Sequence, residues 1–251
     1  MSALMHREIR IRLALLALLF GSYFGSLWIG SLHFPHAYDW RRNVISNLLS
    51  PRDNPGWYWL PSVGVVVAGL CMLPLVGWIE SELDDGETGL ARRVRHPAFL
   101  VGIGCLILSA VVVPQHIHPV MGMRHAHEML ARTSAAGLGV GMLCACGNAA
   151  PEKEMGIRRR KRLRALRTVW RAITLPPILG AVGSGLVVAL GHLHWLGPGL
   201  AGFFRGTVFW RLAFWEWMGS VAVFLFFASA VGMLRGKDEM VASRRGFGSP
   251  L

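Results

Sequence analysis

Apolar residues run almost unbroken through six stretches of the chain, and polar residues gather in the connections between them. An α-helix needs about 20 mostly apolar residues to cross ~30 Å of hydrocarbon, and each stretch meets this length. Within a bilayer each must be helical, because only a helix satisfies its own backbone polar groups there. The pattern predicts an all-α integral membrane protein, a six-helix bundle in one transmembrane domain covering residues 1–251. The predicted spans are 11–30, 59–79, 98–116, 128–147, 172–191 and 210–233.

Composition agrees with a membrane protein. Hydrophobic residues make up 53% of the chain and charged residues 16%, with a mean hydropathy of +0.44. A soluble domain carries about a quarter charged residues. Arg7, Arg10 and Arg12 precede the first apolar stretch, as in a signal peptide. That stretch is longer than a signal core, so we expect a retained first span.

The basic residues are distributed unevenly between the two sides of the predicted bundle. Most of the 26 lysines and arginines lie in the N-terminus, the connections before spans three and five, and the C-terminus. By the positive-inside rule, both termini are then cytoplasmic and the protein is a multi-pass protein of the cell membrane. The net charge of +12 is thus a topology signal. Nucleic-acid binding is not expected.

The most basic segment, residues 157–173 (Ile157 to Ile173), has helical spacing. Its apolar residues Leu163, Leu166, Trp170 and Ile173 share one face, and basic residues occupy the rest. One interpretation is a helix that lies on the anionic cytoplasmic leaflet and binds acidic lipid headgroups. The other is a charge anchor that fixes topology.

Small residues recur at a spacing of four within the spans. Gly21 and Gly25 form one G-x-x-x-G pair, and Gly137 and Gly141 form another. Such faces allow helices to pack closely in lipid. They predict a tight bundle, and other transmembrane subunits are candidate partners.

Histidines are concentrated on the predicted outer side. Of ten histidines, His6 and His96 are cytoplasmic by this topology. The remaining eight lie in or beside the three outer connections: His33, His36, His116, His118, His125, His127, His192 and His194.

Charged residues join these histidines at membrane depth, where they are expensive and mark candidate functional sites. His125, Glu128 and Arg132 share one face of a predicted helix at spacings of three and four. Glu216 lies near the outer end of span six.

Three interpretations of the histidines remain open. Imidazoles with a carboxylate suit zinc, iron or copper, and His116, His118, His125 and His127 are the candidate ligands of a divalent transition metal. A metal-free pocket would instead use His125, Glu128 and Asp39 as acid/base groups. The third interpretation is a set of interfacial histidines that are solvated among headgroups or hydrogen-bonded between loops. Haem is not expected, because the histidines gather at one rim and no C-x-x-C-H occurs.

The first outer connection contains unusually dense hydrogen-bonding chemistry, in the sequence "YDWRRNVISNLLSPRDNPGWYWLPS". Asp39 is predicted to cap a short helix over residues 38–49 that ends before Pro51. Trp40, Val44, Ile45 and Leu48 would form its apolar stripe. The connection is either a lid that binds a lipid headgroup or a brace in which Asp39 and Asp53 pair with arginines. Its candidate ligand-binding residues are Arg41, Arg42, Ser46, Asn47 and Arg52, with Arg132 and Glu216 nearby.

This stretch resembles the bacterial six-span membrane proteins of unknown function grouped with the Frag/DRAM/Sfk-like family. The likeness rests on Ile45-Ser46, the Pro-containing turn, the Gly-bearing second span, and a histidine at the outer start of span four, where His125 and His127 stand. The doubled histidine pairs and the Trp-rich sixth span have no counterpart in the family. The resemblance implies six spans and a role in handling membrane lipids, without a reaction.

The leading hypothesis is therefore a lipid-handling membrane protein with an outward-facing His/Asp/Glu/Arg pocket, which could act as an enzyme on a lipid headgroup. One alternative is a non-catalytic subunit or assembly factor of a larger membrane complex. The other is a metal-binding membrane protein.

Overall fold

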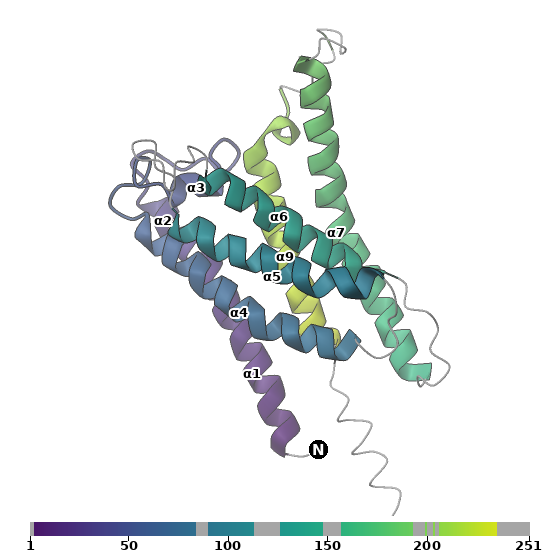
Figure 1. Ribbon diagram of the computed structural model, residues 1–251. Coiled ribbons are helices and arrows are strands. Elements are labelled where there is room, and N and C mark those ends of the chain that lie inside the picture. The colour runs from purple at the N-terminus through teal and green to yellow at the C-terminus, as the bar shows by residue number, and fades with distance from the viewer. Residues whose placement is uncertain are drawn as a thin grey trace, which may run out of the picture.

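The computed structural model is all-helical over the residues it describes, and its long helices pack together in one bundle (Figure 1). It describes residues 3–83, 90–112, 126–147, 157–192, 199, 203 and 206–234, and the side chains of these residues other than 3–6, 158 and 192. Its helices are α1 (Ala3–Phe20), the π-helix η1 (Gly21–Gly25), α2 (Ser26–Leu32), α3 (Ile45–Leu48), α4 (Trp59–Leu83), α5 (Leu90–Val111), α6 (Ala126–Ala145), α7 (Ile157–His192), the 3-10 helix η3 (Val208–Trp210) and α9 (Leu212–Met233).

Within this part of the chain, five helices are long and apolar enough to cross a membrane. They are Arg7–Leu32, Trp59–Leu83, Leu90–Val111, Arg159–Gly191 and Leu212–Met233. They overlap predicted spans one, two, three, five and six. α6 coincides with predicted span four and has 20 residues, but it is not among the five. Its first two turns carry His127, Glu128 and Arg132, which lower its hydropathy.

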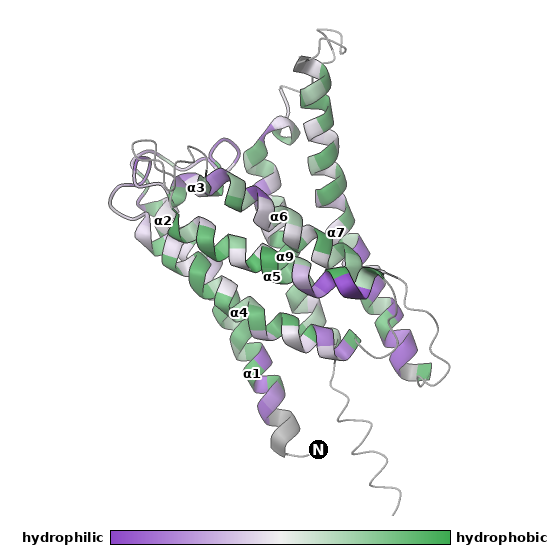
Figure 2. Cartoon of the chain, viewed as in Figure 1, coloured by the Kyte–Doolittle hydropathy of each residue, from purple (hydrophilic) through white to green (hydrophobic). Residues whose placement is uncertain are grey.

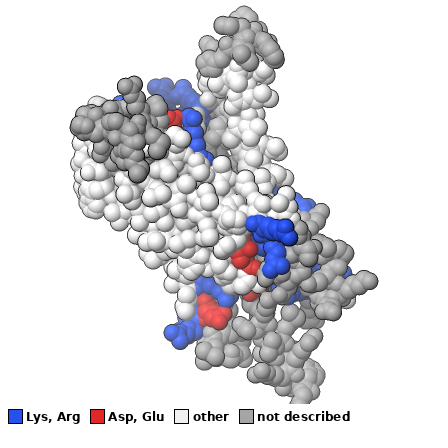
Figure 3. All heavy atoms as spheres, in the orientation of Figure 1, with Lys and Arg blue, Asp and Glu red and all other residues white. Residues whose placement is uncertain are grey.

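Charge and polarity separate along the bundle. Figure 2 shows predominantly apolar ribbons between polar ends, and Figure 3 shows a broad uncharged band between charged groups on the face in view. We call the end at which α2 ends and α4 and α6 begin the α3 end. We call the opposite end, where α1, α5 and α7 begin, the basic end. It carries Arg7, Arg93 and Arg159 among many others.

The first span is one helical rod in which a short π-helix joins two α-helices. η1 lies between α1 and α2, and both flanking residues, Phe20 and Ser26, keep right-handed helical angles. A π-turn inserts an extra residue and shifts the face that the following side chains present. Here it places Tyr23 in the protein interior, 6% exposed, among aromatic rings that include Phe24 and Phe224.

Glycines permit the closest helix contacts. A Cβ on Gly137 would lie 2.8 Å from the Ala98 carbonyl oxygen and 2.8 Å from the backbone of Gly102. A Cβ on Gly64 would clash with the carbonyl oxygen of Ser22. The pairs α5–α6 and α4 with the first span are thus in backbone contact. The Gly137/Gly141 face lies at the first of these contacts, as predicted, whereas a Cβ on Gly21 or Gly25 would meet nothing within 4 Å, so that pair does not form the contact with α4.

The predicted basic segment and the fifth span form a single helix, α7, 36 residues long. Leu163, Leu166 and Trp170 are buried in the protein, and the indole N–H of Trp170 donates to Ser229 Oγ at 3.0 Å. The apolar face of residues 157–173 therefore packs against the bundle and is not available to lie in a leaflet.

The predicted helix over residues 38–49 is wrong in extent, because only Ile45–Leu48 is helical. Asp39 does cap a turn: its Oδ1 accepts the Arg41 N–H at 3.0 Å, and its carbonyl accepts the N–H groups of Arg42 and Asn43. Val44 then adopts an extended conformation (φ −70°, ψ 154°), which breaks the helix before it can propagate.

Candidate functional site

At the α3 end of the bundle, the carboxylate of Glu216, late in the sequence, holds the start of α3, early in the sequence. Glu216 is the only charged residue of α9, in its second turn. Its Oε2 accepts a hydrogen bond from the backbone N–H of Ile45 at 2.8 Å. Ile45 is the first residue of α3, where a backbone N–H has no partner within the helix. Glu216 therefore caps α3 across 171 residues of sequence.

Two further polar groups stand beside Glu216. Ser220 Oγ donates to the Glu216 carbonyl oxygen at 2.9 Å and lies 2.8 Å from the Tyr23 hydroxyl. Because the Ser220 proton is used for the carbonyl, the Tyr23 hydroxyl is the donor in the second bond. The π-turn of η1 thus supplies a buried phenol that joins the first span to α9.

Tyr38 closes the other side of this arrangement. Its hydroxyl lies 3.0 Å from the carbonyl oxygen of Asn43 and 3.2 Å from that of Val44, and donates to them. Burial raises the pKa of the Tyr38 phenol, an effect that the nearby Trp217 indole N–H partly offsets and the Glu216 carboxylate reinforces. Tyr38 therefore stays protonated and keeps its role as a donor.

Asn54 anchors the second half of the same connection. Its side chain is 1% exposed, and its Nδ2 donates to the Leu48 carbonyl oxygen at 3.2 Å and weakly to that of Gly30 at 3.5 Å. Together with buried Ile45, Leu48 and Leu49, it fixes residues 38–58 to the bundle as a packed cover. We refer to residues 38–58 below as the cover.

The arginines of the cover project from it. Arg42 pairs with Asp39 at 3.4 Å and Arg52 with Asp53 at 2.9 Å, yet their side chains are 72% and 63% exposed. Arg41 lies over the Trp40 ring, 5.5 Å from its centroid. The brace pairs predicted from the sequence are thus formed, while the guanidinium groups remain accessible.

Ser46 and Asn47 are half-buried on α3. Among the described residues their side chains make no hydrogen bond, so their polar groups are available to a ligand. They stand on the element that Glu216 caps, a few residues after Arg41 and Arg42.

α6 carries the remaining described candidates. Glu128 and Arg132 pair with each other on an exposed surface, as their spacing predicts. His127 Nδ1 lies 2.7 Å from the Ser109 carbonyl oxygen and 3.1 Å from that of Val112, so it donates to the last turn of α5. In the described part of the chain, no hydrogen bond or ion pair joins this α6 group to Asp39 or the cover arginines.

Of the predicted metal ligands, His127 lies within the described residues. His116, His118 and His125 lie outside the described residues. Among residues that the structure describes, no group of three or more His, Cys, Asp or Glu is arranged to hold a metal ion. The acid/base role proposed for His125 falls outside the described residues in the same way.

Sequence reasoning singled out Glu216 but missed the hydroxyl groups near it, those of Tyr23, Tyr38 and Ser220. One signal was present: the chain has three tyrosines, and Tyr23 lies within an apolar span. A phenol at membrane depth needs a partner for its hydroxyl. No pattern in the sequence names Ser220 as that partner.

Comparison of the chain with protein families, with characterised proteins and with solved structures finds no match.

Proposed function

We propose that this protein is a six-span membrane protein, with both termini cytoplasmic, that binds a phosphate-bearing lipid headgroup at its outer face. In this topology the α3 end is the outer end and α6 is the fourth span. The observation that carries the proposal is the construction of the cover. Its apolar side chains Ile45, Leu48 and Leu49 are buried in the bundle, and its arginines Arg41, Arg42 and Arg52 project from it.

The six-span topology is supported by α6 and by the arginines. α6 has 20 residues, about 30 Å of helix, which matches the hydrocarbon thickness. The starts of α1, α5 and α7 lie at one end of the bundle, as Figure 1 shows, and these are the most basic segments. The positive-inside rule then assigns that end to the cytoplasm.

The ligand class follows from the chemistry of the cover. Guanidinium groups bind phosphate through planar paired donors. Each paired arginine is held by an adjacent acid yet remains largely exposed, so a phosphate can reach it. Ser46 and Asn47 offer further donors one turn away. The resemblance to the Frag/DRAM/Sfk-like proteins stays a prediction and points toward lipids as well.

A rigid platform suits binding at a membrane surface. Glu216 ties the cover to α9, and Tyr38 and Asn54 brace it internally, so its backbone need not be ordered when a ligand arrives. Less entropy is then lost on binding.

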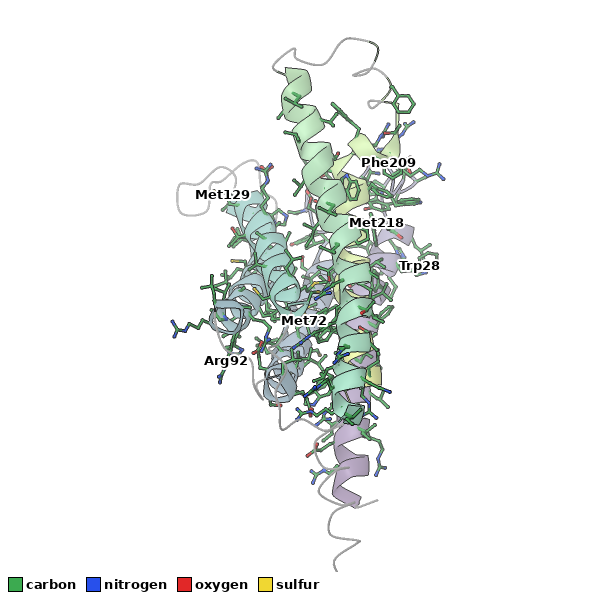
Figure 4. All side chains as sticks on the ribbon, turned by 90° about the vertical axis from the view of Figure 1, so that its right-hand side faces the viewer. Trp28, Met72, Arg92, Met129, Phe209 and Met218 are labelled. Atoms are coloured by element: carbon green, nitrogen blue, oxygen red, sulfur yellow. The ribbon has the colours of Figure 1, made fainter. Side chains whose placement is uncertain are left out.

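Site-specific photocrosslinking tests the proposal. A photoreactive p-benzoylphenylalanine is placed at Asn47 in cells, and mass spectrometry identifies the captured lipids. The matched control position is Trp28, which is 67% exposed on α2 and points away from the bundle in Figure 4. We expect anionic phospholipids to be enriched at Asn47 over Trp28. The enrichment should disappear when Arg41, Arg42 and Arg52 are all replaced by Ala. Equal lipid composition at the two positions would refute headgroup binding.

A further inference from the structure

Six of the basic residues of α7 divide into two sets that the sequence does not distinguish. α7 contains eight basic and no acidic residues. One set faces the bundle. Arg159 donates to the Glu82 carbonyl oxygen at 3.0 Å, Arg171 donates to that of Cys146 through both Nε and Nη2, and Arg167 is 9% exposed. These arginines fix α7 to α4 and α6.

The other set faces away. Lys161, Arg162 and Arg164 are exposed, and in the described part of the chain their side chains make no ion pair or hydrogen bond. Two acids lie at the end of α4. Glu80 forms a salt bridge with Arg95, and Glu82 is buried. The positive charge of the second set is therefore not neutralised within the described protein.

The exposed face of α7 continues from these residues without a break. At spacings of three and four, exposed positions follow one another along a single stripe: Lys161, Ala165, Thr168, Ala172, Leu175, Leu179, Val182 and Leu186. The stripe changes from basic to small and then to large apolar residues. From Arg164 to Leu175 the helix rises about 16 Å.

We propose that Lys161, Arg162 and Arg164 form a binding surface for anionic phospholipid headgroups of the leaflet at the basic end. The acyl chains of these lipids would lie along Leu175, Leu179 and Val182. The direct continuity between basic and apolar exposed positions favours a lipid over a nucleic acid or an acidic protein, which would gain nothing from the apolar half of the stripe. A cationic residue near such a surface strengthens attachment to anionic lipid.

Native mass spectrometry of the full chain tests this surface. The protein is incubated in detergent with equal amounts of phosphatidylglycerol and phosphatidylcholine, and retained lipids are counted by class. We expect wild type to prefer phosphatidylglycerol. The triple variant Lys161→Ala, Arg162→Ala, Arg164→Ala should reduce that preference by about fivefold or more. The charge-conserving variant Lys161→Arg, Arg162→Lys, Arg164→Lys should retain it.

A second background variant separates this test from lipid binding at the proposed outer headgroup site. The same drop is expected in protein that already carries Arg41→Ala, Arg42→Ala and Arg52→Ala, because the two sets lie at opposite ends. Unfolding temperatures measured without added lipid confirm that each variant is folded. An unchanged lipid preference in the triple variant would overturn the proposal. So would loss of the preference in the charge-conserving variant.

Discussion

The carboxylate of Glu216 and the backbone N–H of Ile45 meet at 2.8 Å, which ties the sixth predicted span to the first connection of the chain. A carboxylate near the end of an apolar helix is costly unless a partner is built for it. Here the partner is the unsatisfied N–H at the start of α3. The bond serves both groups, and it determines where the cover lies.

Replacing Glu216 should loosen the cover. Glu216→Ala removes the acceptor and leaves the Ile45 N–H without a partner, at a cost of about 1–3 kcal/mol in unfolding free energy. Glu216→Gln keeps an acceptor oxygen and should cost less. The cover carries Arg41, Arg42 and Arg52, all trypsin sites, so limited proteolysis in detergent reports its release directly.

Glu128→Ala is the matched control for this prediction. It also removes an acidic side chain at the same end, but from an exposed pair with Arg132 on α6. Its tryptic pattern within residues 38–58 should equal that of wild type. Equal cleavage rates in Glu216→Ala and Glu128→Ala would show that the Glu216 bond does not hold the cover.

Close packing between α5 and α6 depends on the absence of a side chain at Gly137. Gly137→Ala would place a Cβ 2.8 Å from the backbone of the facing helix and force the two helices apart. Overpacking of this kind costs about 1–3 kcal/mol. Gly104→Ala on α5 has nothing within 4 Å of its Cβ, and it should be neutral or slightly stabilising. Thermal unfolding in detergent compares the two; equal unfolding temperatures would contradict the close contact.

Much of the fold can be predicted from the sequence, because a backbone in lipid must satisfy its own polar groups and therefore forms long apolar helices. Five predicted spans correspond to apolar helices of membrane length, and a helix also forms at the fourth. The residues at which helices begin and end are harder to predict. Segment 157–173 and the fifth span differ sharply in polarity, yet polarity alone does not end a helix. α7 continues through this change in polarity and through Pro176 and Pro177.

The site is less predictable than the fold, because its geometry comes from contacts between distant residues. The sequence marked Glu216 as a charge at membrane depth, but not Ile45 as its partner. The pairs Asp39–Arg42 and Glu128–Arg132 were accessible to prediction because helix and turn spacing places their members side by side. The helix over residues 38–49 was not, because the extended Val44 interrupts it after a favourable cap.

His127 has a structural role that can be measured on its own. Its Nδ1–H caps the last turn of α5 through the Ser109 carbonyl oxygen. His127→Ala should lower the unfolding free energy by about 1 kcal/mol, the net value of such a bond. His36→Ala is the control, because His36 is exposed and its side chain makes no hydrogen bond in the described part of the chain. An equal effect of the two variants in a denaturant titration would contradict the capping role.

The same bond sharpens the metal interpretation of the histidines. With Nδ1 committed as a donor, Nε2 is the ring nitrogen left to bind a metal, and it has no partner among the described residues. The interpretation predicts stoichiometric zinc, iron or copper in protein purified without a histidine tag, and loss of that metal in His127→Gln but not in His33→Gln. Elemental analysis decides it, and metal-free wild-type protein would remove the interpretation.

Arg95 and Glu80 form a buried bidentate pair at the basic end, where the Arg95 side chain is fully buried and both N–O distances are 2.8 Å. Arg95→Met removes the cation and leaves Glu80 largely enclosed without its partner. Breaking a buried pair in this way costs about 3–5 kcal/mol. The double variant Arg95→Met, Glu80→Gln removes both charges and should recover part of that loss. Arg132→Ala, from an exposed pair, should change unfolding free energy by less than about 1 kcal/mol. If Arg95→Met proves no more destabilising than Arg132→Ala, the pair does not hold α4 and α5 together.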